Sequence, residues 1–206
     1  MADASWQKYI DAIQENNVFA CVKDQLVLEL AANGGWHSRL IYEHNPKKLV
    51  CVEPDNFFTE PLYIEFASQH NDVECVWDTY NNYLINNKNK FDVVVCCGLL
   101  YHLHSPLDCI EKIINIHQPK TFILESIDAE IEHLNDEVLN LCGNAFEDNY
   151  KHIPYSFIIP IKKYKEILSN VGYTCIKEFR WADYGVEHPS KQDAVMIVFE
   201  NEQKET

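Results

Sequence analysis

Three side chains that can transfer protons stand within four positions of one another: Tyr101, His102 and His104. They follow the apolar run FDVVVCC, which ends at Cys97, and the glycine Gly98. An imidazole changes its charge near neutral pH, so a histidine beside a tyrosine on a loop is a candidate general base. We expect His102 to be that base, and His104 and Tyr101 are the next candidates. The alternative is a structural or surface role for these histidines.

The stretch from Leu26 to Asp55 predicts a nucleoside-binding unit. A compact apolar run is followed by a turn with paired glycines, a segment with helical apolar spacing, and a second apolar run closed by Glu53. This pattern is typical of a βαβ unit. Glycine in the first turn allows positive φ and close approach of a ligand to the backbone. An acid about 20 residues after the turn can accept hydrogen bonds from both hydroxyls of a ribose.

The turn differs from the dinucleotide fingerprint, which needs three glycines at fixed spacing. Here Ala31, Ala32 and Asn33 precede only two glycines. Glu29, at the end of the first run, would repel a diphosphate but would suit a ligand that carries an ammonium group. A nicotinamide-dependent oxidoreductase is therefore an alternative that the turn disfavours.

These residues must be positioned by an α/β fold. The unbroken apolar run that ends at Cys97 predicts a central strand covered on both faces, and ligands bind at the carboxyl ends of such strands. The loop 98–104 should therefore overhang a bound ligand. We expect further strands at 73–77, 119–126, 173–181 and 194–199, and helices at 5–17, 57–66, 106–117, 131–141 and 161–170.

Several residues are expected to end these elements. Ser5 and Ser105 are predicted N-caps, with Pro106 as a first helical residue, and Gly172 is a predicted helix end. Segment 144–154 is a candidate lid over substrate. The acidic tail 200–206 is expected to fray.

Composition bounds the function. The 206 residues are expected to form one domain, 1–206. No apolar run is long enough to span a membrane or to act as a signal peptide, so we expect a cytoplasmic protein. The net charge of −15 disfavours nucleic acid as a partner. The eight cysteines form no C-x-x-C pair, so we expect reduced core thiols and no metal. A small-molecule substrate and a monomer or homodimer are expected.

The blocks NGGWH, EPD, GLLYHLHSPLDCI and LES together resemble the class I S-adenosylmethionine-dependent methyltransferases. The branch nearest in motif includes the bacterial tRNA wobble-uridine carboxymethyltransferases. The chain departs from that branch in its acidic charge, in Ala31-Ala32, and in lacking a long N-terminal extension. The resemblance implies a Rossmann-like seven-stranded sheet, mostly parallel with one antiparallel edge strand and helices on both faces. It implies S-adenosylmethionine as cofactor, bound by residues Glu29, Ala31, Asn33, Gly35, Glu53, Pro54, Asp78, Thr79, Cys97, Gly98 and His102.

This resemblance leads to a hypothesis of methyl transfer to an oxygen or nitrogen of a small polar metabolite or sugar derivative. The alternatives are a tRNA-modifying (carboxy)methyltransferase and a non-catalytic binding subunit. For Asp78 a simple turn role is equally open. Trp6 and Tyr9, on the first helix, either touch the ligand or anchor that helix in the core. Secondary candidates for substrate contacts are Glu125, His133, His152 and Tyr155.

Overall fold

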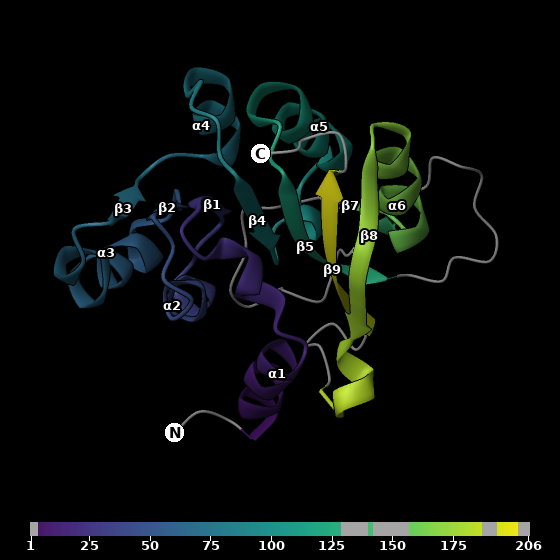
Figure 1. Ribbon diagram of the computed structural model, residues 1–206, viewed down its shortest axis with the longest axis horizontal. Helices are drawn as coiled ribbons and strands as arrows, with labels where there is room; N and C mark the ends of the chain where they lie inside the picture. Colours follow the sequence, from purple (N-terminus) through teal and green to yellow (C-terminus); the bar gives the residue numbers. More distant parts are fainter. Residues whose placement is uncertain (1–3, 129–139, 142–156, 187–192, 202–206) are drawn as a thin grey trace.

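The computed structural model describes residues 4–128, 140–141, 157–186 and 193–201. Its centre is a seven-stranded sheet with the order β3-β2-β1-β4-β5-β9-β8, which crosses the view in Figure 1. The strands are β1 (Leu26–Leu30), β2 (Lys48–Val52), β3 (Val73–Val76), β4 (Val93–Cys97), β5 (Thr121–Asp128), β8 (Tyr173–Arg180) and β9 (Asp193–Asn201). A separate two-stranded sheet pairs β6 (Asn140–Leu141) with β7 (Phe157–Ile158).

Five strands, β1 to β5, are parallel. Leu28 on β1 lies opposite Val50 on β2 and Val94 on β4, so β1 is enclosed between two neighbours. The order reverses between β1 and β4, the place where α/β folds of this kind bind ligands. The predicted seven-stranded, mostly parallel α/β sheet is confirmed.

The antiparallel strand is β9, and it lies inside the sheet between β5 and β8. The strand at the edge is β8, which runs parallel to β5 because each of them is antiparallel to β9. A register shift between Cys175 and Lys177 interrupts the pairing of this edge strand.

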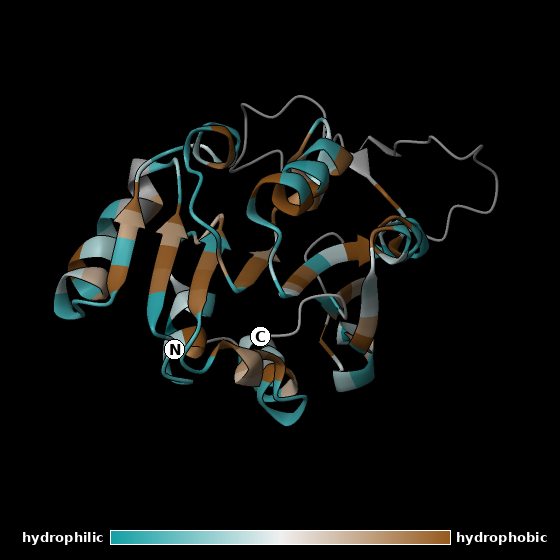
Figure 2. Cartoon of the chain, turned by 45° about the horizontal axis from the view of Figure 1, so that its top comes forward, coloured by the Kyte–Doolittle hydropathy of each residue, from teal (hydrophilic) through white to brown (hydrophobic). Residues whose placement is uncertain are grey.

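Alternate residues of the strands feed two hydrophobic cores, one on each face of the sheet. Val93, Val95 and Cys97 of β4 belong to one core, and Val94 and Cys96 belong to the other. Strands covered on both faces are apolar throughout, as the run from Val93 to Cys97 predicts. Figure 2 shows the apolar residues concentrated in the strands and on one side of the helices.

Helices cover both faces. Helices α1 to α3 share a core with one face, and α4 to α6 share a core with the other. The α-helices are α1 (Ala4–Glu15), α2 (Trp36–Tyr42), α3 (Asn56–Glu65), α4 (Tyr80–Asn86), α5 (Pro106–Lys112) and α6 (Ile161–Asn170). The shorter helical turns are η1 (Val18–Val22), η2 (Ala67–Gln69), η3 (Leu100–His102), η4 (Ile113–His117) and η5 (Trp181–Tyr184). No helix in the described ranges is long and apolar enough to cross a membrane.

Of the two predicted N-caps, Ser5 is wrong and Ser105 is confirmed in position. Helix α1 already includes Ala4, so Ser5 lies inside the helix. Ser105 occupies the N-cap position of α5, but its side chain makes no capping hydrogen bond. Pro106 does begin α5, where its missing N–H costs nothing, and Gly172 follows α6 with φ of 89°.

Other expectations changed at element ends. The helix predicted for 131–141 is wrong at its last two residues, which form β6, and 131–139 lie outside the described residues. Glu200 and Asn201 pair in β9, so the tail begins later than expected, and 202–206 are not described. The candidate lid, 144–154, also lies outside the described residues.

Candidate functional site

The carboxyl ends of the parallel strands meet along one edge of the sheet, as expected for parallel pairing. Strand β1 ends at Leu30, β2 at Val52 and β4 at Cys97. The turn to α2, the residue Glu53 and the glycine Gly98 follow these ends directly. The structure therefore brings together three parts of the site predicted from sequence.

The Glu53 carboxylate is held by backbone donors. The N–H of Asn33 donates to Oε2 over 2.9 Å, and the N–H of Asp55 donates to Oε1 over 3.1 Å. Burial raises the pKa of Glu53, and these two hydrogen bonds oppose the increase. The neighbouring Pro54 is exposed. The turn after β1 and the end of β2 are thus joined through one side chain.

The turn after β1 uses left-handed backbone conformations. Ala31 has φ of 58°, Asn33 has φ of 49° and Gly35 has φ of 81°. A Cβ added to Gly35 would lie 2.3 Å from Cδ1 of Leu62 on α3, so packing also requires a glycine there. At Gly34, an added Cβ would meet nothing within 4 Å. The open side of the turn is therefore at Gly34.

Glu29 is almost fully buried, at 2% exposure. Its Oε2 accepts a hydrogen bond from Oγ of Ser38 over 2.5 Å and lies 3.6 Å from Sγ of Cys51. Burial raises the pKa of Glu29 to about 7, against the opposing effect of these hydrogen bonds. Its role toward an ammonium group stays a prediction.

Asp78 and Thr79 stand after β3 and shape the start of α4. Oδ1 of Asp78 accepts from the N–H of Thr79 over 2.8 Å, and Oγ1 of Thr79 accepts from the N–H of Asn82 over 3.2 Å. These are turn and capping contacts. Contact of either residue with a ligand stays a prediction.

The loop after β4 begins with Gly98, whose φ of 75° favours glycine. Tyr101 is buried, His102 is partly exposed and His104 is exposed. The ring centroids of Tyr101 and His102 are 4.4 Å apart. Of the two histidines, His102 is the less exposed.

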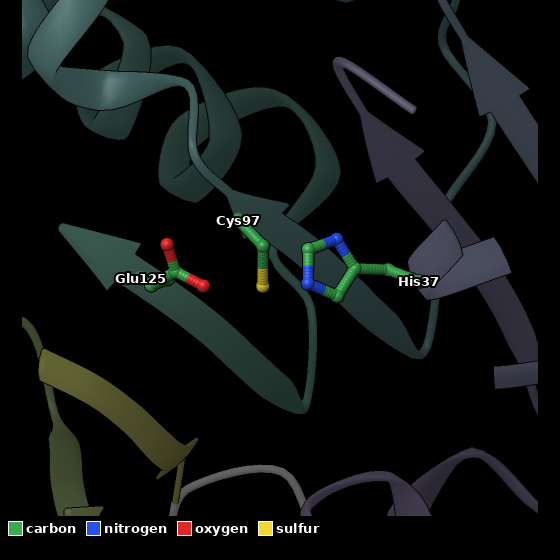
Figure 3. A group of neighbouring side chains, drawn as sticks. All are labelled: His37, Cys97 and Glu125. Carbon is green, nitrogen blue, oxygen red and sulfur yellow. The ribbon is translucent and has the colours of Figure 1, made fainter. Parts of the chain in front are cut away.

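A second group of chemically active side chains lies under helix α1, and we call Tyr9, His37, Cys97 and Glu125 the four-residue cluster. Oη of Tyr9 donates to Oε2 of Glu125 over 2.5 Å and lies 2.6 Å from Nε2 of His37. Single ligand atoms of His37, Cys97 and Glu125 all lie within 4.8 Å of one another. Figure 3 shows the Cys97 sulfur between the imidazole and the carboxylate.

Burial shifts the pKa of every member of the four-residue cluster in the direction that favours the uncharged form. It raises the pKa of Glu125 to about 7 and lowers the pKa of His37 to about 4. It also raises the pKa of Cys97 and of Tyr9 well above their usual values. At neutral pH, His37, Cys97 and Tyr9 are therefore uncharged, whereas the Glu125 carboxyl is close to the midpoint of its titration.

A family model described as a methyltransferase domain matches residues 5–178. The chain belongs to this methyltransferase domain family. The expectation of a methyltransferase is thereby confirmed.

Among curated relatives, the methyltransferase is similar to the tRNA U34 carboxymethyltransferase of Helicobacter acinonychis. The two are 30% identical over 115 residues, which cover 54% of this chain and 43% of the relative. The chain thus aligns with less than half the length of that protein.

Solved structures share the fold of this methyltransferase. A Listeria monocytogenes protein described as an S-adenosylmethionine-dependent methyltransferase matches with a TM-score of 0.70 and 14% identity, covering 94% of this chain and 99% of that one. The magnesium protoporphyrin IX methyltransferase of Synechocystis, solved with bound SAM, matches with a TM-score of 0.64 and 10% identity, covering 95% and 80%. At 14% and 10% identity, the similarity shows a shared fold and nothing more.

Sequence reasoning did not single out His37 for this methyltransferase, and it treated Tyr9, Cys97 and Glu125 separately. Tyr9 is a core anchor, at 1% exposure, and also a polar partner of Glu125. Trp6 packs on it with ring centroids 5.0 Å apart. The positions of His37 and Glu125 are 88 apart, and no spacing rule links them. The remaining secondary candidates His133, His152 and Tyr155 lie outside the described residues.

Proposed function

We propose that this methyltransferase transfers a methyl group from S-adenosylmethionine to an oxygen or nitrogen of a small polar molecule, with the cofactor at the carboxyl ends of β1, β2 and β4. The observation that carries the proposal is the position of Glu53 at the end of β2, fixed by the N–H groups of Asn33 and Asp55. A carboxylate at this point of a βαβ unit suits the two hydroxyls of a ribose.

The described residues fit a nucleoside. A carboxylate offers two oxygens and about four acceptor sites, so the backbone donors that orient Glu53 are compatible with further hydrogen bonds from a ribose. The space beside Gly34 leaves the turn accessible to a ligand, because a Cβ there meets no atom within 4 Å. Hydrogen bonds to an ionised carboxylate are also stronger than those between neutral groups.

The bound cofactor supplies an electrophilic methyl group and a neutral thioether as leaving group. The chain's own residues then have to align the acceptor and exclude water. The buried strand ends and the buried Tyr101 serve this purpose. His102, beside Tyr101, takes the proton from an acceptor that carries one.

The charge of the chain supports a small acceptor. A net charge of −15 repels the phosphates of a nucleic acid unless a local basic patch opposes it. A small polar metabolite or sugar derivative carries little or no such penalty.

A tRNA acceptor is the second candidate, favoured by the similarity to the tRNA U34 carboxymethyltransferase of Helicobacter acinonychis. Filter binding of bulk tRNA at low and at moderate salt compares the two candidates. We expect weak binding even at low salt. Tight binding that falls steeply with salt would reverse the order of the candidates.

Calorimetric titration of S-adenosylmethionine tests the cofactor site. Glu53→Ala should weaken binding at least about tenfold, since a charge-assisted hydrogen bond contributes about 1.5–3 kcal/mol. Glu74→Ala is the matched control, because Glu74 is an exposed carboxylate on the neighbouring strand β3 that pairs with Lys48. Equal affinity in folded Glu53→Ala and wild-type protein would contradict the proposed site.

A further inference from the structure

The four-residue cluster combines the side chains that bind borderline-soft metal ions. An imidazole nitrogen, a thiol sulfur, a carboxylate and a phenol oxygen come from α2, β4, β5 and α1. Nitrogen and sulfur donors with a carboxylate are typical of zinc sites, whereas Mg²⁺ and Ca²⁺ prefer oxygen alone.

We propose that His37, Cys97 and Glu125 bind one Zn²⁺ ion, with the Tyr9 hydroxyl as the fourth donor. The ion would be structural, because all four positions of a tetrahedron are taken by the protein. This inference goes beyond the proposed methyl transfer and does not depend on it.

The geometry is compatible with a tetrahedral ion. Zinc bonds of about 2.0–2.3 Å place neighbouring donors about 3.3–3.8 Å apart. The ligand atoms of His37, Cys97 and Glu125 lie within 4.8 Å of one another, so the longest separation has to close by at most about 1.0–1.5 Å. Tyr9 Oη, now 2.5 Å from Glu125 Oε2 and 2.6 Å from His37 Nε2, has to move outward by a similar amount.

Charge also favours the ion. A thiolate from Cys97 and a carboxylate from Glu125 neutralise Zn²⁺, while His37 and Tyr9 bind as neutral groups. A neutral site suits a position where Cys97 and Glu125 are only 5% and 2% exposed, since an unbalanced charge there would be costly. His37 is partly exposed and gives the ion a path from solvent.

In the absence of the ion, protons take its place. The hydroxyl of Tyr9 then donates to Oε2 of Glu125 and stays within hydrogen-bond distance of Nε2 of His37. The competing explanation is a cluster that functions with protons alone, and this is the other outcome of the test.

Titration with Co²⁺ and then Zn²⁺ tests the proposal on the full chain, without cofactor or acceptor. After dialysis against a chelator, one equivalent of Co²⁺ should produce the intense visible bands of a tetrahedral ion together with a thiolate charge-transfer band. Zn²⁺ should abolish both. Because no methyl transfer is measured, failure here leaves the proposed function intact.

Cys97→Ala should lose the charge-transfer band and bind the metal at least about 100-fold more weakly, since even residues that only support metal ligands contribute 10- to 100-fold. Cys96→Ala is the matched control. Cys96 is the adjacent buried residue of β4 and faces the other core, where it contacts Cys109. This variant should retain the wild-type spectrum.

Glu125→Gln is a second variant in case Cys97→Ala does not fold. It should keep the charge-transfer band but weaken binding at least about tenfold. Zn²⁺ should raise the melting temperature of the wild-type protein and of Cys96→Ala, with no increase in Cys97→Ala. The proposal is overturned if the wild-type protein binds neither metal at micromolar concentration, or if the bands persist in Cys97→Ala.

Discussion

The hydroxyl of Tyr9 on α1 donates a hydrogen bond to Oε2 of Glu125 on β5 over 2.5 Å, and it joins residues 116 positions apart. Tyr9 is 1% exposed and Glu125 is 2% exposed. Neither group has ready access to bulk water, so this buried hydrogen bond replaces contacts that each group would otherwise make with water. The contact fixes the first helix over the strand ends that form the proposed site.

Tyr9→Phe should therefore destabilise the protein. The substitution leaves the Glu125 carboxyl and the His37 imidazole each without this partner, and the expected loss in the free energy of unfolding is about 1–3 kcal/mol. Urea denaturation at pH 7 measures it. Tyr42→Phe is the control, because the Tyr42 hydroxyl bonds Asp72 over 3.0 Å at a site only partly buried. Equal losses in the two variants would show that burial of the Tyr9 hydrogen bond has no special effect.

Glu125 should make stability fall as pH rises through the neutral range. Its pKa in the folded protein is raised from 4.5 to about 7, so between these values the folded state keeps a proton that the unfolded chain has released. Its stabilising contribution is complete below about pH 4.5 and is lost as pH rises through about 7.

Glu125→Gln removes this dependence. Relative to wild type, the variant should gain up to about 3 kcal/mol in the free energy of unfolding between pH 4.5 and pH 8. Glu29, whose pKa is also raised to about 7, and His37, whose pKa is lowered to about 4, remain in both proteins. Their effects largely cancel in the comparison, although His37 lies close to Glu125. Parallel stability curves over this range would contradict the assignment.

The two glycines of the turn should respond differently to alanine. Gly35→Ala places a Cβ 2.3 Å from Leu62 at φ of 81°, and we expect a loss of about 2–4 kcal/mol from the left-handed backbone and the overlap. Gly34→Ala meets open space, so its stability should change by less than about 1 kcal/mol. Thermal or urea denaturation of both variants measures the difference. A Gly35→Ala protein as stable as wild type would mean that Leu62 and α3 shift at little cost.

His102 should matter more than His104 for methyl transfer. If His102 removes a proton from the acceptor, His102→Ala should lower the single-turnover rate about 10²- to 10⁴-fold with little change in cofactor affinity. His104→Ala tests general damage to the loop, because His104 is exposed on the same loop. The measurement uses an acceptor found by screening metabolites for transfer of a labelled methyl group. If both variants lose the same fraction of the single-turnover rate, His102 is not a general base, and the loop only aligns the acceptor with the methyl group.

The sequence by itself determined the βαβ unit, the central strand ending at Cys97 and the position of Glu53. These features depend on local patterns, namely apolar runs, paired glycines and an acid at a fixed distance along the chain. The donors that fix Glu53, from Asn33 and Asp55, also lie within 20 residues of it. Local spacing was therefore sufficient to predict this part of the site.

Only the tertiary structure decided that β9 lies between β5 and β8 and that Tyr9, His37, Cys97 and Glu125 meet. Strands β8 and β9 both have the apolar pattern of an extended segment, and this pattern does not predict which of them pairs with β5. The four side chains come from four elements, and no spacing along the chain links them. Their chemistry arises because packing of α1 and α2 on the sheet removes them from water together, and no one-dimensional pattern records that event.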